Sequence, residues 1–333
     1  MENTELGTTG PTVSRLGLGL MGMSGMYGPA DRAESIATVH AALDRGVTLL
    51  DTGDFYGMGH NELLLREALR GRDRDRAVIS VKFGALRDAD GAFLGVDLRP
   101  AAIKNFVAYS LQRLGTDHID VYRPARLSPE IPVEEVVGTL AELVQKGWIR
   151  HIGLSEVGAE TLRRAHAVHP ITDVQIEYSL ISRGIERDVL PAANELGVAV
   201  TAYGVLSRGL ISGHWKPQAG AQTAAGDFRT HLPRFTGDAL DHNLALVERL
   251  RKIADAKGVT VAQLAVAWVL DRGAGVVPLI GARRRDRLDE ALGALDVTLD
   301  ADELAAIEAA VPTGAAVGER YDAAQMRLLD SER

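Results

Sequence analysis

Short apolar segments alternate with helix-like segments along most of this 333-residue chain. The expected strands lie at 16–20, 47–51, 78–82, 119–122, 149–154, 174–177, 198–203 and 276–279. The expected helices lie at 31–45, 60–70, 100–114, 133–146, 158–168, 184–196, 241–257, 260–271, 284–293, 300–310 and 321–329. Strands without an apolar–polar alternation, each followed by a helix, are typical of a buried parallel sheet. Eight such units predict an α/β fold of the closed (β/α)8 type, a TIM barrel.

Three segments fall outside this alternation. Residues 3–14 predict an N-terminal hairpin with a turn at Thr9-Gly10-Pro11. A segment rich in Gly and Asp at 84–97 predicts a loop, and the long irregular segment at 207–240, after the seventh strand, predicts a flap over the barrel mouth. No linker interrupts the pattern, so we expect a single domain over residues 1–333. An open doubly wound sheet is the alternative, but its G-x-G-x-x-G fingerprint is absent near the first strand.

Composition narrows the class of function. Apolar residues make up 46% of the chain and charged residues 25%, as in ordinary globular proteins, and the formal net charge is −8. Acidic and basic residues are interspersed along the chain, and acids are in excess. A net negative charge of this kind disfavours nucleic acid and anionic membranes as partners. The absence of cysteine excludes disulfides, thiolate metal sites and cysteine nucleophiles. We find neither a signal peptide nor an apolar run near the ~20 residues that span a bilayer, and therefore expect a cytoplasmic location.

Asp51, Tyr56 and Lys82 are candidate catalytic residues. Each lies at or just after the expected carboxyl end of a strand, and that end of a TIM barrel carries the active site. A free tyrosine, with a pKa of about 10, is a poor acid at neutral pH, and a nearby ammonium favours its phenolate. Lys82 is therefore expected to lower the pKa of Tyr56, while Asp51 holds Lys82. Such a trio can protonate a carbonyl oxygen as a hydride arrives, although a purely structural Lys–Asp pair fits the spacing equally well.

Several motifs occur in an order and spacing that resemble the aldo-keto reductase superfamily. They are Asp51-Thr-Gly-Asp-Phe-Tyr56-Gly, Lys82-Phe-Gly, Ile152-Gly-Leu-Ser155, Gln175-Ile-Glu-Tyr178-Ser, Ala202-Tyr203 and Val277-Pro278-Leu-Ile-Gly281. The resemblance implies a (β/α)8 barrel that uses NADPH, sometimes NADH, to reduce aldehydes and ketones without a metal ion. It also implies the roles given above for the Asp, the Tyr and the Lys.

One residue of the family's catalytic tetrad is missing. Similar proteins carry a histidine at the end of the fourth strand, where this chain reads Arg123-Pro-Ala125-Arg126, and Ala125 occupies that position. The imidazole helps to orient the carbonyl, which a methyl group cannot do. Three alternatives stay open: the remaining trio suffices; Arg123, His60 or a water replaces the imidazole; or the protein binds cofactor with little turnover.

The resemblance also implies a cofactor site along the strand ends. Tyr203 is expected to stack on the nicotinamide ring, and Ser155 and Gln175 to bind the carboxamide. Glu156 stands where the family usually has asparagine. After the seventh strand the family's usual Ser-Pro-Leu is altered, and the expected pyrophosphate contacts are Gly204, Leu206, Ser207 and Arg208.

Arginines follow the last expected strand. The candidate cofactor contacts there are Gly281, Arg283, Arg287 and Glu290. Arginines at a helix start oppose the helix dipole, so a bound anion explains them better than a solvated surface does. The 2′-phosphate of the adenosine ribose is such an anion, and we therefore expect NADPH rather than NADH. Glu290 resembles the family's adenine contact, although Ala291 replaces the asparagine that usually follows it.

The expected partner is a small-molecule carbonyl substrate, and the sequence predicts neither its identity nor the oligomeric state. Candidate lining residues are apolar or aromatic, which favours a hydrophobic or aromatic carbonyl: Met21, Met23, Tyr27, Phe55, Phe83 and the flap at 207–240. Two other functions stay open. One is a cofactor-binding regulatory or redox-sensing protein, which the missing imidazole supports, and the other is a lyase that uses Lys82 as a Schiff-base amine.

Overall fold

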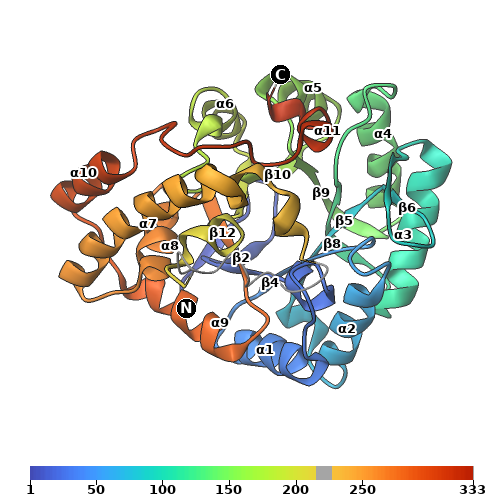
Figure 1. Ribbon diagram of the computed structural model, residues 1–333. Helices are drawn as coiled ribbons and strands as arrows, with labels where there is room; N and C mark the ends of the chain where they lie inside the picture. The colour runs from blue at the N-terminus through green and yellow to red at the C-terminus, as the bar shows by residue number, and fades with distance from the viewer. Residues whose placement is uncertain (215–226, 333) are drawn as a thin grey trace.

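The computed structural model describes residues 1–214 and 227–332, and it confirms the predicted (β/α)8 barrel (Figure 1). Parallel strands close in the order β3–β4–β5–β8–β9–β10–β11–β12, and β12 pairs back onto β3. Their bounds are β3 (Gly17–Gly19), β4 (Leu49–Gly53), β5 (Val78–Phe83), β8 (Ile119–Pro124), β9 (Ile149–Ser155), β10 (Ile171–Glu177), β11 (Ala199–Tyr203) and β12 (Val276–Gly281). Every predicted strand is present, with shifts only at its ends.

Helices surround this ring of strands (Figure 1). They are α1 (Arg32–Asp44), α2 (His60–Leu69), α3 (Pro100–Leu114), α4 (Val133–Gln145), α5 (Ala159–Val168), α6 (Val189–Leu196), α7 (Gly237–Lys257), α8 (Val261–Leu270), α9 (Arg285–Leu292), α10 (Ala301–Ala310) and α11 (Ala323–Met326). The predicted helix at 184–196 is split into a short 3-10 turn and α6, and α7 begins before the predicted residue 241.

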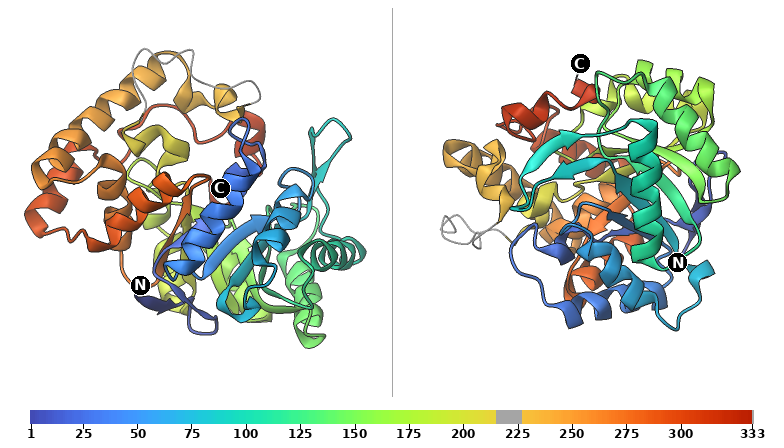
Figure 2. Two further views of the ribbon diagram at one scale, coloured as in Figure 1. Left: turned by 90° about the horizontal axis from the view of Figure 1, so that it is seen from below. Right: turned by 90° about the vertical axis from the view of Figure 1, so that its right-hand side faces the viewer.

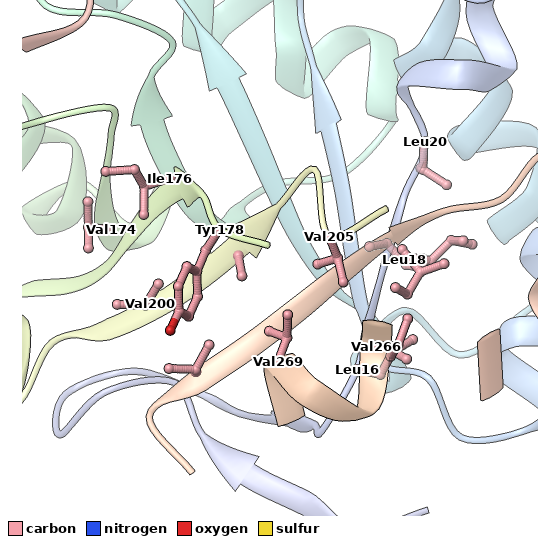
Figure 3. Packing of buried hydrophobic residues seen from close by; sticks show 14 of the residues in the cluster. Leu16, Leu18, Leu20, Val174, Ile176, Tyr178, Val200, Val205, Val266 and Val269 are labelled. Carbon is pink, nitrogen blue, oxygen red and sulfur yellow. The ribbon is translucent and has the colours of Figure 1, made fainter. Parts of the chain in front are cut away.

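The main apolar core lies between the strands and the helices. Every residue of β10 is buried, as expected for a parallel strand covered on both faces. Val266 and Val269 of α8 share this core with Leu16 and Leu18 at β3 and Val200 of β11 (Figure 3). Fully burying one such side chain contributes about 1.5–3 kcal/mol, so this layer holds the helices against the ring.

A smaller apolar cluster closes one end of the barrel. It contains Leu6 and Val13 from the N-terminal hairpin together with Leu49, Val121 and Val277 from barrel strands. The hairpin pairs β1 (Asn3–Glu5) with β2 (Thr12–Ser14), which confirms the predicted hairpin. Because the hairpin packs against residues in the first half of their strands, the opposite, carboxyl end of the barrel stays available for a site.

The helix predicted at 60–70 is confirmed as α2, and its N-cap is Gly59. Asn61, a residue type that often caps helices, is instead buried inside the first turn. Its side chain accepts a hydrogen bond from the Thr52 hydroxyl at 2.6 Å and donates to the Leu20 carbonyl oxygen at 2.8 Å. Asn61 therefore ties α2 to the carboxyl ends of β3 and β4, a long-range role that outweighs its capping preference.

The segment at 84–97 is not the predicted loop. It forms an antiparallel hairpin of β6 (Ala85–Arg87) and β7 (Phe93–Val96), which extends away from the barrel (Figure 2). The turn is built by Asp88, whose backbone N–H donates to the Ala92 carbonyl oxygen at 3.1 Å and whose carboxylate accepts from the Ala92 N–H at 2.7 Å. Local side chain–backbone bonding of this kind favours a tight turn over an open loop.

The irregular segment at 207–240 has structure in its described parts. Short 3-10 turns span η4 (Ser207–Ser212), η5 (Phe228–His231) and η6 (Pro233–Phe235), and the segment ends in the first turn of α7. The centre of the predicted flap, residues 215–226, lies outside the described residues. Among the described residues no single helix is long and apolar enough to cross a membrane; one pair, α7 with α8, passes by combined length and composition but is bent by 88°.

Candidate active site

A cavity of about 710 Å³ lies at the carboxyl ends of the barrel strands. Its wall takes one residue or more from each strand end, in ring order Gly19, Asp51, Lys82, Ala125, Ser155, Gln175, Tyr203 and Gly281. A volume of this size suits a small-molecule site. The predicted location of the site, at this end of the barrel, therefore coincides with a cavity.

Lys82 and Asp51 form a buried pair in the wall of this cavity. The Lys82 ammonium is paired with the Asp51 carboxylate and donates to the Gln175 amide oxygen at 2.7 Å. The Gln175 amide nitrogen and the Ser80 hydroxyl donate to the other Asp51 oxygen at 2.7 and 2.9 Å. Each polar group of the cluster thus has a partner, which fixes the lysine in one position.

Tyr56 lies beside this cluster. Its ring centroid is 5.4 Å from the Lys82 Nζ and 4.8 Å from the edge-on ring of Phe55, and only 5% of the residue is exposed. Within the described residues the Tyr56 hydroxyl makes no hydrogen bond to the protein, although the residue lines the cavity. The structure therefore brings the three predicted catalytic residues together and leaves the phenol proton free for a ligand.

The expected direction of the Tyr56 pKa is wrong. Burial and the Asp51 carboxylate raise the pKa of Tyr56 well above its ordinary value. Lys82 does not reverse this, because burial lowers the pKa of Lys82 and its charge is matched by Asp51. The cation that lowers the Tyr56 pKa in part is Arg126. Tyr56 is consequently a protonated phenol at neutral pH, the state that a proton donor requires.

Neither of the two side chains suggested as a substitute for the imidazole reaches the cavity. Arg123 is fully buried beneath it, where it pairs with Asp173 at 2.9 Å and donates to the Ser80 hydroxyl at 3.0 Å. His60 lies outside, with its ring nitrogens bonded to Ser24 at 2.9 Å and Arg32 at 3.3 Å. Both suggestions are therefore wrong.

The predicted nicotinamide contacts lie at the ends of β9, β10 and β11. Ser155 is buried and its hydroxyl has no partner among the described residues, so it is available to a ligand. The Gln175 amide, by contrast, is already engaged by Lys82 and Asp51. Tyr203 lines the cavity with its hydroxyl bonded to Glu156 at 2.6 Å and to Tyr321 at 2.9 Å, so its ring is held in place as a stacking surface would need to be.

The C-terminal segment completes the cavity wall, and sequence reasoning missed it. The segment runs from α10 across the barrel end to α11 (Figure 1). Buried Arg320 anchors it through paired hydrogen bonds to Glu156, the shorter at 2.8 Å, and a 3.4 Å contact to Glu177. Arg320 lowers the pKa of Glu156 against the effect of burial. The neighbouring Tyr321 then lies against the site.

The predicted pyrophosphate contacts after β11 are only partly placed as expected. Gly204, Leu206 and Arg208 line the cavity, whereas Ser207 is buried outside the lining residues. The Arg208 guanidinium donates to the Glu177 carboxylate at 2.9 Å and lies 4.5 Å from the Tyr321 ring centroid. The Glu177 carboxylate thus already accepts a hydrogen bond from the Arg208 guanidinium, which was expected to bind phosphate.

Positive charge gathers at the other end of the cavity, around the start of α9. Arg283 donates to the carbonyl oxygens of Tyr27, Gly28 and Pro29 at 3.1–3.2 Å, which ties the segment after η1 (Met21–Ser24) to the end of β12. Arg287 donates to Glu290 at 2.9 Å. His214, which was not among the predicted site residues, contacts Glu290 at 2.9 Å. Gly281, Arg283, Arg284, Arg287, Glu290 and His214 all line the cavity.

The aromatic lining is largely as predicted. Met21, Tyr27 and Phe55 line the cavity, while Met23 and Phe83 are buried in the core, Phe83 stacked on Tyr122 with centroids 4.1 Å apart. Further lining residues come from the hairpin, the segment after β11 and the C-terminal segment: Phe93, Phe228 and Tyr321. The cavity therefore combines an aromatic part near Tyr56 with a cationic part near α9.

Comparison with known proteins agrees with this geometry. The Aldo/keto reductase family profile matches residues 15–312. The chain is 39% identical over 324 residues to probable aldo-keto reductase 1 of Glycine max, covering 96% of this chain and 92% of that protein. It belongs to the aldo/keto reductase family. The match spans the barrel and nearly all of the relative, and so indicates an oxidoreductase that acts on carbonyl compounds.

Solved structures of this family share the fold. A glycerol dehydrogenase from Gluconobacter oxydans superposes with a TM-score of 0.83 at 30% identity, covering 92% of this chain and 94% of that chain. An aldo-keto reductase from Bacillus halodurans, solved in its holo form, gives a TM-score of 0.78 at 28% identity, covering 96% and 98%. The likeness extends over the full barrel.

Asp54, which lies between Asp51 and Tyr56 in the sequence, leads to a prediction of how folding stability depends on pH. Neither carboxylate oxygen of Asp54 has a hydrogen-bond partner among the described residues. Burial is the largest cause that raises the pKa of Asp54 to about 8, and the neighbouring Glu62 carboxylate is the second. Since the unfolded chain releases this proton near pH 4, folding stability should fall as pH rises from about 4 to about 8 and then level off. We expect Asp54→Asn to remove that decline and to be the more stable protein at pH 8.

Urea denaturation at several pH values measures this difference. Asp90→Asn, in the exposed turn of the β6–β7 hairpin, is the matched control. A wild-type stability that rises or stays level between pH 5 and 8 relative to Asp54→Asn would contradict the assignment of a protonated Asp54.

Proposed function

We propose that this protein reduces an aldehyde or ketone to an alcohol by hydride transfer from NADPH, with Tyr56 as the proton donor. The observation that carries the proposal is the buried cluster in which Lys82 is held between Asp51 and Gln175, with its ammonium 5.4 Å from the ring centroid of Tyr56, whose hydroxyl has no partner among the described residues. The carbonyl oxygen becomes negative as the hydride adds to the carbonyl carbon, and a positioned neutral phenol can protonate that oxygen.

The residues divide the work as follows. Tyr56 Oη donates its proton to the carbonyl oxygen, which becomes the alcohol hydroxyl, and recovers a proton from water. Lys82 supplies positive charge beside the phenolate that forms, and Asp51 and Gln175 keep the ammonium in place. The aromatic side chains around Tyr56 exclude water from the carbonyl, which strengthens these electrostatic interactions.

The cavity fits a dinucleotide phosphate cofactor, which supplies the hydride when bound. The Ser155 hydroxyl, buried without a partner among the described residues, is a free hydrogen-bonding group for the carboxamide. Tyr203, whose hydroxyl is held by Glu156, offers a fixed ring in the wall of the same cavity. At the opposite end Arg283, Arg284 and Arg287 line the cavity next to the N-terminus of α9. Clustered guanidinium groups at a helix start favour phosphate, and we propose NADPH over NADH on this ground.

The nucleotide preference is testable at Arg287. We expect Arg287→Ala to weaken NADPH binding about 10- to 100-fold, as lost hydrogen bonds to a charged phosphate imply, and to change NADH binding less than about twofold. Titration of each nucleotide by protein fluorescence measures both. Arg285→Ala is the matched control, because Arg285 pairs with Glu34 and is not among the lining residues. Equal weakening of NADPH and NADH would place Arg287 away from the 2′-phosphate.

The function itself is tested by following NADPH oxidation with a panel of aldehydes, ketones and quinones, with NADPH binding titrated in parallel. We expect turnover on at least one neutral aromatic or hydrophobic carbonyl. Tight NADPH binding without turnover on the whole panel would favour the alternative, an NADP(H)-binding regulatory or redox-sensing protein. Borohydride trapping of an adduct on Lys82 would favour a lyase. A cytoplasmic location and a single domain over residues 1–333 belong to the same proposal.

A further inference from the structure

Arg126 is an unusual arginine among those that line the cavity. It lies directly after Ala125, whose methyl side chain also lines the cavity and offers no hydrogen bond. Arg126 donates to the Ala125 carbonyl oxygen at 2.6 Å, and its second terminal nitrogen lies 3.4 Å from the Tyr321 hydroxyl. No carboxylate in the described part of the chain lies within ion-pair distance of it. The guanidinium therefore has donors left for a ligand.

Several other cations near the cavity are already paired with carboxylates. Arg208 pairs with Glu177, and Arg229 with Asp227. Lys82 is neutralised by Asp51, and Arg123 is paired with Asp173 outside the cavity. Arg283 and Arg287 belong to the far, cofactor end. Arg87 also lines the cavity without a carboxylate partner among the described residues, but it donates to the Gly91 carbonyl oxygen at 2.8 Å and lies over the Phe55 and Phe93 rings at the β6–β7 hairpin. Arg126 is the guanidinium whose charge acts on Tyr56.

Two contacts hold Arg126 in place before any ligand binds. The hydrogen bond to the Ala125 carbonyl fixes one edge of the guanidinium, and the ring of Tyr321 lies 5.6 Å from its central carbon. Tyr321 is in turn held by Tyr203 at 2.9 Å. A donor that is positioned in advance stabilises developing charge without a reorganisation cost at the moment of reaction.

We propose that Arg126 is a second hydrogen-bond donor to the substrate's carbonyl oxygen, acting with Tyr56 to orient the carbonyl and to stabilise the negative charge that develops on it. This inference rests on the proposed reductase function. In the step, the hydride adds to the carbonyl carbon, the C=O π electrons move to oxygen, and Tyr56 transfers its proton to that oxygen. Arg126 keeps all of its protons and contributes charge and direction only.

Steady-state kinetics of Arg126→Gln and Arg126→Lys test the proposal with a neutral aldehyde from the panel. For Arg126→Gln we expect kcat/KM to fall about 10²- to 10³-fold, as for loss of one oxyanion donor, while the Kd of NADPH changes less than about twofold. Arg126→Lys should retain part of the rate because it keeps the charge. Arg164→Gln on α5, whose arginine pairs with Glu134 outside the cavity, is the matched control.

Two readouts separate a role in the reaction from a role in folding. Guanidinium ions added to Arg126→Ala should restore activity, whereas equal concentrations of sodium or urea should not. In addition, the alkaline limb of the kcat/KM profile, where the proton donor is lost, should move to higher pH in Arg126→Gln, because the removed cation favoured the phenolate.

Several results would overturn the proposal. Unchanged kcat/KM for neutral aldehydes in Arg126→Gln, with loss confined to carboxylate-bearing substrates, would make Arg126 a receptor for an anionic substituent. A raised NADPH Kd with unchanged kcat would assign it to the cofactor. If the wild type is active and Arg126→Gln is equally active, only this inference fails; if the wild type reduces no carbonyl, the proposed function fails and takes the inference with it.

Discussion

Replacing Tyr56 with phenylalanine should lower kcat for carbonyl reduction about 10²- to 10⁴-fold, the range that a positioned general acid contributes. The substitution removes only the Tyr56 hydroxyl group. That group has no protein partner among the described residues, so the fold loses no hydrogen bond there. The aromatic contact with Phe55 and the ring beside Lys82 are kept. We therefore expect NADPH affinity and thermal stability to change little.

Stopped-flow measurement of a single turnover tests this expectation most cleanly, because product release does not mask the chemical step. Tyr109→Phe is the matched control, since Tyr109 is 57% exposed on α3 and away from the cavity. Equal single-turnover rates for Tyr56→Phe and the wild type would remove Tyr56 from the mechanism.

The second large effect concerns stability, at the buried pair beneath the site. Arg123→Met leaves the Asp173 carboxylate fully buried without its partner, and breaking a buried pair in this way costs about 3–5 kcal/mol. The Thr201 hydroxyl, which donates to Asp173, cannot replace a positive charge. Activity should fall as well, because Arg123 donates to Ser80 and Ser80 donates to Asp51.

Urea denaturation of the single and double variants separates the pair's charge from its volume. We expect Arg123→Met with Asp173→Leu to recover much of the stability that Arg123→Met loses, since no uncompensated charge is left in the barrel. Arg150→Met, at an exposed position of β9, is the control for arginine removal. A double variant less stable than Arg123→Met would contradict the view that the stranded carboxylate causes the loss.

The barrel was predictable because its signals are local. An apolar run followed by helical spacing specifies each βα unit, and the position of a residue at a strand end follows from the run itself. Asp51, Tyr56 and Lys82 could be placed together for this reason: parallel strands present their carboxyl ends at the same side of a sheet. The hairpin at Ala85–Val96 was missed because its strands are short and partly exposed, and because the turn between them, Asp88-Ala-Asp-Gly91, is typical of a loop.

Contacts between distant segments were not predictable from spacing. Arg320 reaches Glu156 across the barrel end, and the only signal in the sequence was an acidic residue at a strand end where similar proteins carry asparagine. Arg123 was suggested as a substitute for the imidazole because it lies two residues before Ala125, and alternate residues share a face of a strand. β8 ends at Pro124, so that alternation stops before Ala125, and Arg126 is the one that reaches the cavity.

The direction of the Tyr56 pKa was also beyond the sequence. A nearby ammonium lowers the pKa of a phenol only when its charge is not already matched and when burial does not dominate. Here burial is the largest cause and Asp51 the second. Neither the depth of Tyr56 nor the pairing of Lys82 can be read from a spacing of residues along the chain.

The most direct test of hydride transfer uses NADPH carrying deuterium at one or the other C4 position, with the best carbonyl substrate of the panel. Mass spectrometry of the alcohol then counts the deuterium atoms that reach the carbinol carbon. We expect one deuterium per NADPH consumed from a single diastereomer in the wild type, and product formation too slow to detect on the same timescale in Tyr56→Phe. Alcohol formed without deuterium from either diastereomer, or NADPH bound with no alcohol formed, would contradict the account.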